Sequence, residues 1–208
     1  MANANQSINK FFASTIFAGS FQSIENIPEF DTQIECCFIG RSNVGKSSII
    51  NSITKNNKLA KTSKTPGRTQ SINYFNIKKK INVVDLPGYG YAKISKVLQN
   101  QLSELIQSFI KSRINLKHVF VLIDAKVGIK SSDIDMFDLI NYAEKQFSIV
   151  LTKIDKCPRS FIEKQQNSLL SLMKNYPNYF SKIFFSSSKT NQGIIDVQKS
   201  IYRISQES

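Results

Sequence analysis

The stretch from Gly40 to Ser48, G-R-S-N-V-G-K-S-S, constrains this chain most, because it fits the pattern G-x-x-x-x-G-K-[S/T]. Its glycines let the backbone turn so that successive N–H groups point at phosphate oxygens. In this pattern Lys46 reaches the β- and γ-phosphates, the Ser47 hydroxyl ligates Mg²⁺, and the following helix directs its positive dipole end at the anion. We therefore predict a nucleotide-binding loop made of Gly40, Arg41, Ser42, Asn43, Val44, Gly45, Lys46, Ser47 and Ser48.

Strands and helices are predicted to alternate along the chain. Residues 34–39 form an apolar run before the loop, and a helix begins after it near Ser48. Further strands are expected at 71–77, 81–84, 119–124, 147–152 and 183–186, and helices at 95–112, 131–144, 161–174 and 194–204. The pattern indicates an α/β fold, a mostly parallel six-stranded sheet with helices on both faces, whose ligand lies at the carboxyl ends of the strands.

The length of 208 residues, with 41% hydrophobic residues, suits one domain with its own core. We predict a single domain over residues 23–208, preceded by an extension over residues 1–22 that is partly flexible. The extreme start is Asn- and Ser-rich without a long period and is expected to be loose. The aromatic side chains expected to hold the rest of it against the domain are Phe11, Phe12, Phe17 and Phe21.

The chain is strongly basic, since it has 28 Lys and Arg residues but only 15 Asp and Glu, which gives a net charge of +13. Such a field attracts polyanions, namely RNA, DNA or an anionic membrane. The alternative is a solvated basic surface on a protein that binds nothing larger than its nucleotide. Residues 55–68 hold five cations and no acid, and Pro66-Gly67 predicts a surface loop there.

The cysteines, Cys36, Cys37 and Cys157, follow no metal-ligand spacing, and their odd number suggests a reducing compartment. Ser14 and Thr15 interrupt the short apolar run over residues 10–19, so we do not expect an export signal. No stretch approaches the roughly 20 apolar residues that a membrane span requires. We expect a cytoplasmic protein.

Asp85-Leu86-Pro87-Gly88 follows the strand predicted at 81–84. A carboxylate at this strand end would hold Mg²⁺ directly or through water, as the second acidic element of phosphate-loop enzymes does. Because Gly88 has no side chain, its N–H can approach the γ-phosphate closely. This segment is therefore expected to sense whether the γ-phosphate is present.

Thr152-Lys153-Ile154-Asp155 closes a later strand and favours guanine as the base. One carboxylate at Asp155 accepts from both N1–H and the 2-amino group of guanine. Adenine offers neither donor and would leave that carboxylate unpaired, so GTP is favoured over ATP. Backbone N–H groups of the small residues Ser186 to Ser188 are expected to meet the guanine carbonyl.

Five motifs together, G-R-S-N-V-G-K-S-S, T-P-G-R-T-Q, D-L-P-G-Y-G-Y-A, T-K-I-D-K and F-S-S-S-K, resemble the EngB/YsxC-type bacterial GTP-binding proteins of the Era-related branch. The resemblance extends from about Phe17 to Ile204. It implies a Ras-like phosphate-loop GTPase fold that binds GTP or GDP with Mg²⁺. It also implies a role in assembly of the large ribosomal subunit, with a link to cell division and septation.

The resemblance also assigns residues by their matching positions. It implies that Ser47 and Thr69 ligate Mg²⁺, and that Lys46, Thr69 and Gly88 act in catalysis. The first switch would comprise Gly67, Arg68, Thr69, Gln70 and Ser71. The second switch would begin with Asp85, Leu86, Pro87 and Gly88, and the base would be bound by Thr152, Lys153, Ile154, Asp155, Phe185, Ser186 and Ser187.

Two positions depart from small GTPases in general. Thr152 stands where most have asparagine, and a hydroxyl makes only part of an amide's hydrogen bonds, so we expect guanine to be held more loosely. Tyr89 stands where many carry the glutamine that orients the attacking water. A phenol cannot present an amide's paired donor and acceptor, so hydrolysis should be slow without a partner.

Asn43 occupies the loop position at which some relatives hold a potassium ion whose charge could replace an arginine finger; alternatively it only braces the loop. The hypothesis we favour is a monomeric GTP-driven switch whose partners are ribosomal RNA and ribosomal proteins of the large-subunit precursor. One alternative is an RNA-binding assembly factor that uses GTP as a structural ligand with negligible turnover. Another, an ATP-dependent phosphotransferase, fits the phosphate loop but not Asp155.

Overall fold

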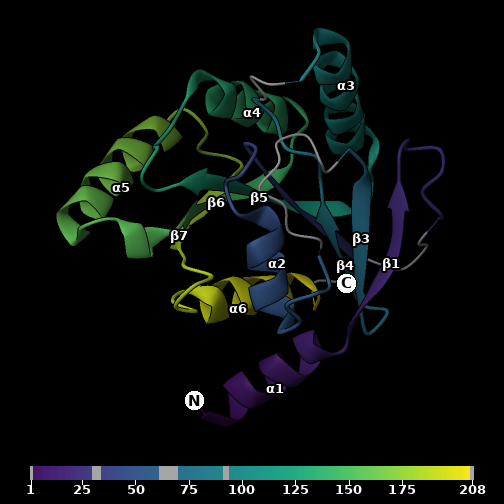
Figure 1. The fold of residues 1–208 in the computed structure, drawn as a ribbon, viewed down its shortest axis with the longest axis horizontal. Coiled ribbons are helices and arrows are strands. Elements are labelled where there is room, and N and C mark those ends of the chain that lie inside the picture. The colour runs from purple at the N-terminus through teal and green to yellow at the C-terminus, as the bar shows by residue number, and fades with distance from the viewer. Residues whose placement is uncertain (1, 30–33, 61–69, 91–93, 207–208) are drawn as a thin grey trace.

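A seven-stranded sheet forms the centre of the molecule, in the order β1-β3-β4-β2-β5-β6-β7 (Figure 1). The structure is a computed structural model that describes residues 2–29, 34–60, 70–90 and 94–206. Strands β4, β2, β5, β6 and β7 run parallel, whereas at one edge β3 pairs antiparallel with β4 and β1 pairs antiparallel with β3. The strands are β1 (Thr15–Phe21), β2 (Ile34–Gly40), β3 (Ile72–Ile77), β4 (Ile81–Asp85), β5 (Leu116–Asp124), β6 (Gln146–Thr152) and β7 (Phe180–Phe185).

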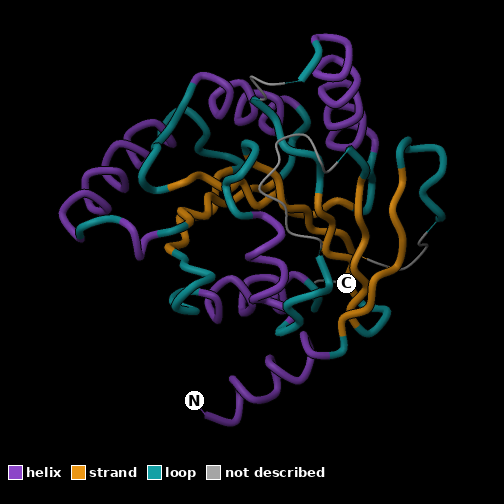
Figure 2. The backbone as a smooth tube through the Cα atoms, in the orientation of Figure 1, coloured by secondary structure: helices purple, strands orange, loops and turns teal. Residues whose placement is uncertain are grey.

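Helices cover both faces of this sheet, as the tube view of Figure 2 shows. One face packs against α3 (Lys96–Ser112), α4 (Ser131–Tyr142) and α5 (Arg159–Met173), and the other against α1 (Ala2–Ala13), α2 (Lys46–Thr54) and α6 (Ile194–Ile204). A short 3-10 helix, η1 (Ile154–Lys156), follows β6. The predicted α/β class and the helices on both faces are confirmed.

Alternating side chains of the central strands separate two apolar cores. On β2, Cys37 and Ile39 join the core under α3 and α4, while Cys36 and Phe38 join the core under α2 and α6. This is the period of two expected for a strand that is buried on both faces. Burial raises the pKa of both thiols, so they remain protonated apolar filling.

The predicted number of six strands is wrong, because β1 adds a seventh at the edge of the sheet. Among the described strands it pairs with β3 alone, with a register shift between Phe17 and Gly19. Ile16 is 61% and Phe17 52% exposed, so the strand lacks the buried apolar run by which the other strands were predicted. Whether residues 1–22 form a separable extension stays a prediction.

The composition predicted no regular element at the extreme start, whereas Ala2–Ala13 form helix α1; that the start is partly flexible stays a prediction. Ile8, Phe11 and Phe12 are buried on one side of this helix, and the Phe11 ring meets Tyr202 of α6 edge-on at 5.1 Å between centroids. Tertiary packing therefore stabilises a short helix whose own sequence shows little periodicity. None of the described helices is long and apolar enough to cross a membrane.

Candidate nucleotide-binding site

The predicted phosphate loop connects the end of β2 to the start of α2. Two residues have left-handed backbone angles, Asn43 with φ of 61° and Gly45 with φ of 108°. Gly40 must lack a side chain, because a Cβ there would lie 2.7 Å from the Leu122 carbonyl oxygen. Helix α2 begins directly at Lys46. The loop therefore curls in front of a helix N-terminus, the arrangement that binds phosphate.

Asp85 ends β4, beside β2, where its carboxylate lies next to the phosphate loop. The Ser47 hydroxyl donates to Asp85 Oδ2 at 3.4 Å, whereas the buried Oδ1 has no hydrogen-bond partner among the described residues. Burial raises the pKa of Asp85, and nearby Lys46 partly opposes this rise. Burial likewise lowers the pKa of Lys46, which the Asp85 charge partly restores. Each group lowers the cost of burying the other.

A buried carboxylate oxygen without a partner, next to a serine hydroxyl, fits a hard divalent cation held by oxygen ligands. These are the two described members of the predicted Mg²⁺ set. The third member, Thr69, lies outside the described residues, as do Gly67 and Arg68. Of the remaining first-switch residues, Gln70 is exposed, and the Ser71 hydroxyl shares a 2.7 Å hydrogen bond with Ser20 of β1.

Thr152 and Lys153 both contact the phosphate loop. The Thr152 hydroxyl donates to the Val44 carbonyl oxygen at 2.7 Å and is almost fully buried. Lys153 Nζ donates to the Asn43 carbonyl oxygen at 2.7 Å and pairs with Asp124 Oδ2 at the same distance. This hydroxyl therefore supports the loop, and the looser hold on guanine stays a prediction.

Asp155 and Ser187 meet at the other end of the site. The Ser187 hydroxyl donates to Asp155 Oδ1 at 2.6 Å and accepts the backbone N–H groups of Lys189 and Thr190, each at 3.2 Å. The exposed Asp155 is thus oriented by a hydroxyl that the turn after β7 holds in place. Ser186 and Ile154 are buried beneath it, where the Ile154 N–H donates to the Ser186 carbonyl oxygen at 3.3 Å.

One cavity of about 460 Å³ brings the phosphate loop and this end of the site together. Its walls come from the loop, from α2, from the segment after β6 and from the segment after β7. The lining residues are Val44, Gly45, Ser48, Asn51, Ser52, Asn57, Thr152, Lys153, Asp155, Lys156, Ser188 and Lys189. Motifs more than 100 residues apart in the chain therefore meet at the carboxyl ends of parallel strands of one sheet.

Two acidic residues beside the site, Asp124 and Asp133, were not predicted from the sequence. Asp124 ends the parallel strand β5, a position that could have identified it. Asp133 lies in the first turn of α4 and pairs with Arg41 of the phosphate loop, with 3.2 Å from Arg41 Nε to Asp133 Oδ2. No local sequence motif predicts the pair of Arg41 and Asp133, because the two residues are 92 positions apart.

The parallel sheet, the glycine-rich loop before a helix and the acid at the end of β4 together define a phosphate-loop nucleotide-binding domain. The family described as "50S ribosome-binding GTPase" matches residues 35–153. The chain is 44% identical over 169 residues to the "probable GTP-binding protein EngB" of Fusobacterium nucleatum, which covers 81% of this chain and 85% of that protein. It is 38% identical to the protein of the same name from Rickettsia africae, over 89% of this chain and 85% of that protein.

Solved structures agree on the fold. A crystal structure of a probable EngB GTP-binding protein superimposes with a TM-score of 0.66 at 23% identity, covering 84% of this chain and all of the other. Era, solved with MgGDPNP and a segment of 16S ribosomal RNA, gives 0.66 at 22% identity, over 83% of this chain and 57% of Era. This chain belongs to the EngB family of GTPases.

Proposed function

We propose that this chain binds GTP and GDP in the 460 Å³ cavity and hydrolyses GTP slowly as a switch in assembly of the large ribosomal subunit. One observation carries the nucleotide assignment, namely that the phosphate loop and Asp155 line the same cavity. The loop would hold the phosphates while Asp155 accepts the two donors of guanine. The hydroxyl of Ser187 presets the carboxylate for that role.

The residues that would hold Mg²⁺ are Ser47, Thr69 and, through water, Asp85. When bound, Mg²⁺ neutralises phosphate charge. Lys46 and the loop N–H groups would stabilise the negative charge of the transition state. The Asp85 Oδ1 atom supports this assignment, because it is buried and none of the described residues donates a hydrogen bond to it. A potassium ion at Asn43 belongs to the same proposal; the exposed Asn43 side chain leaves room for it.

Slow hydrolysis is expected because the residue that follows Gly88 in the chain is a tyrosine and has no amide side chain to orient water. Tyr89 takes that sequence position, and its hydroxyl donates to Asp133 Oδ1 at 2.8 Å. The phenol is therefore committed to another group. This same contact favours the second candidate, an RNA-binding assembly factor that uses GTP as a structural ligand. Turnover measured with immature large subunits present separates the two.

The proposed ribosomal partners are RNA and proteins of the large-subunit precursor. Support comes from the net charge of +13, the exposed lysines Lys55 and Lys58 after α2, and the description of the matched family. A monomeric protein of the cytoplasm, with a link to cell division and septation, completes the proposal. Replacing Lys55, Lys58, Lys61 and Lys64 by Gln should weaken particle binding and flatten its salt dependence.

The test of the nucleotide assignment is competition binding of fluorescent GDP and GTP against ATP and xanthine nucleotides, in potassium and Mg²⁺. Wild type should prefer guanine nucleotides, and Asp155→Asn should shift the preference toward xanthine, whose 2-oxo group suits an amide donor. The exposed Asp135→Asn serves as the charge-matched control. A wild type without guanine preference would contradict the assignment.

A further inference from the structure

The backbone of Tyr89 bonds the segment after Gly88 to the phosphate loop. Its N–H donates to the Gly40 carbonyl oxygen at 3.3 Å, and its carbonyl oxygen accepts the Ser42 N–H at 3.2 Å. Arg41 and Tyr89 thereby form a parallel β-bridge. Because Gly88 is the residue immediately before, any displacement of Tyr89 also displaces the N–H group expected to meet the γ-phosphate.

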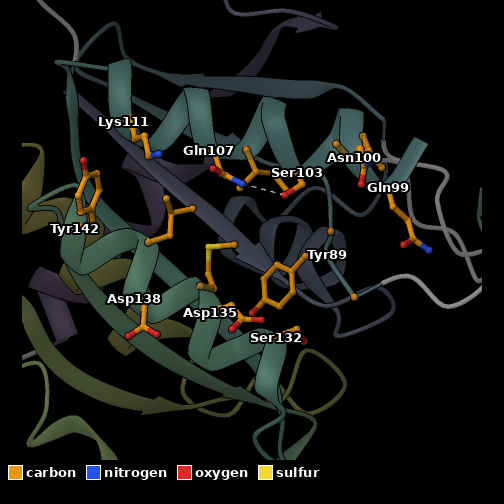
Figure 3. Close-up of a pocket in the computed structure, with 16 residues that line it drawn as sticks. Tyr89, Gln99, Asn100, Ser103, Gln107, Lys111, Ser132, Asp135, Asp138 and Tyr142 are labelled. Atoms are coloured by element: carbon orange, nitrogen blue, oxygen red, sulfur yellow. Dashed lines mark hydrogen bonds between the residues drawn. The ribbon is translucent and has the colours of Figure 1, made fainter. Parts of the chain in front are cut away.

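The Tyr89 side chain extends this connection to helix α4. Its hydroxyl donates to Asp133 Oδ1 at 2.8 Å. Burial, together with the negative charge of Asp133, raises the pKa of Tyr89 well above its ordinary value, so the phenol stays protonated and remains a donor. Figure 3 shows the Tyr89 ring beside Ser132 and Asp135 of α4, at one end of a cavity of about 710 Å³ between α3 and α4.

Asp133 is fully buried and accepts hydrogen bonds from three sources. Besides the Tyr89 hydroxyl, Oδ1 accepts Arg41 Nε at 3.2 Å, and Oδ2 accepts the Lys130 N–H at 2.8 Å. Arg41 Nη2 also donates to the Gly128 carbonyl oxygen at 2.6 Å. One carboxylate in the first turn of α4 therefore ties a residue of the phosphate loop to the residue after Gly88.

We propose that Tyr89, Asp133 and Arg41 form a positioning cluster that holds Gly88 against the phosphate loop and so sets the affinity for GTP relative to GDP. The inference rests on the proposed function, GTP binding and hydrolysis at this site. Tyr89 and Asp133 are positioning residues, because the group that would meet the γ-phosphate is the N–H of Gly88.

The direction of the effect follows from the difference between the two nucleotides. GDP has no γ-phosphate, so its binding does not require Gly88 to be ordered, whereas GTP binding does. Releasing the Tyr89 hydroxyl adds an ordering cost that only the GTP complex bears. The loss of one hydrogen bond to a charged partner can change the affinity for GTP relative to GDP by at most about 10- to 100-fold. Because the backbone bridge between Tyr89 and Arg41 remains, we expect a change of about 3- to 10-fold.

The decisive comparison is between Tyr89→Phe and Tyr176→Phe. Tyr176 donates its hydroxyl to Asp138 Oδ1 at 2.7 Å, so it makes the same kind of bond to the same helix without touching the phosphate loop. Dissociation constants for GDP and a non-hydrolysable GTP analogue, single-turnover hydrolysis rates and melting temperatures are measured for both variants. We expect Tyr89→Phe to weaken the analogue about 3- to 10-fold relative to GDP and to slow hydrolysis, and Tyr176→Phe to lower only the melting temperature.

Asp133→Ala, which removes the acceptor of the Tyr89 hydroxyl, tests whether Tyr89 acts through Asp133. In that background, Tyr89→Phe should cause little further change in the ratio of the two dissociation constants, since both changes remove the same interaction. If Asp133→Ala does not fold, the pair of tyrosine variants still decides. If Tyr89→Phe keeps the wild-type ratio of the two dissociation constants and only its melting temperature falls, this inference is overturned while the proposed function stands. A wild type that binds no GTP would overturn the proposed function and this inference together.

Discussion

Asp85 and Asp133 are both buried carboxylates beside the phosphate loop, but their surroundings differ. Asp133 is paired with Arg41 and also accepts from the Tyr89 hydroxyl and the Lys130 N–H. Within the part of the chain that the structure describes, Asp85 has one long hydrogen bond from Ser47 and one buried oxygen with no partner. The first carboxylate is satisfied by the fold itself, whereas the second is incomplete without a ligand. We infer that the region around Asp133 maintains the site and that Asp85 serves its chemistry.

The largest expected effect is on stability at Asp133. Asp133→Ala removes a buried partner of Arg41 and of the Tyr89 hydroxyl, and breaking such a pair costs about 3–5 kcal/mol of unfolding free energy. Urea unfolding measures this loss. The control is Asp135→Ala, an exposed carboxylate of the same helix turn, which should change stability by less than about 0.5 kcal/mol. Equal losses of unfolding free energy in Asp133→Ala and Asp135→Ala would contradict the structural role proposed for Asp133.

Asp85→Asn should show the opposite pattern, with binding affected and stability spared. An amide in this position lacks the charge that holds metal-bound water, and Mg²⁺ affinity should fall about 10- to 100-fold. The measurement is a Mg²⁺ titration of the GDP dissociation rate, with Asp135→Asn as the control. Stability without Mg²⁺ should stay equal to wild type or rise. Unaltered Mg²⁺ dependence would remove Asp85 from the metal site.

The pH dependence of stability should separate Asp85→Asn from wild type further. Burial raises the pKa of Asp85 above its ordinary value of 3.8, so ionisation is less favourable in the folded than in the unfolded protein. Without metal or nucleotide, this group therefore destabilises the wild type as the pH rises from about 4 through its raised pKa. Asp85→Asn should gain stability relative to wild type over that rise, measured by urea unfolding at several pH values. A difference independent of pH would contradict the raised pKa.

The smallest effect is expected at Asp155, an exposed carboxylate oriented by one hydroxyl. Ser187→Ala removes the 2.6 Å bond to Asp155, and GDP affinity should fall about threefold because the carboxylate is no longer preset. Fluorescent GDP titration measures this, and Ser181→Ala, an exposed hydroxyl of β7, is the matched control. An unchanged affinity would mean that Ser187 contributes nothing to orienting Asp155.

Most of the fold could be predicted from the sequence, because the strands buried on both faces are continuous apolar runs and the helices have apolar stripes. The elements that prediction missed depend on distant partners. Strand β1 is half-exposed and exists by pairing with β3, and α1 is a short helix stabilised by packing on α6. The local sequence of β1 and of α1 therefore does not predict either element.

The candidate site divides in the same way. The phosphate loop, Asp85 and Asp155 were predicted because their chemistry depends on local spacing and on strand ends. The contact of the Thr152 hydroxyl with the Val44 carbonyl oxygen could not be predicted, because a four-residue motif does not show which distant backbone group its hydroxyl meets. The position of Tyr89 in the chain showed that the amide side chain of a glutamine is missing there. Only its hydrogen bond to Asp133 suggests a positioning role for the tyrosine.

What the sequence by itself determined is the class of fold and the residues of the phosphate loop, since periodic burial and loop geometry are encoded within a few neighbouring residues. Only the tertiary structure decided which carboxylate is satisfied and which keeps an oxygen without a donor among the described residues. That distinction depends on donors from Arg41, Tyr89 and Lys130 that converge on Asp133 from three separate segments, and no local pattern specifies such a convergence.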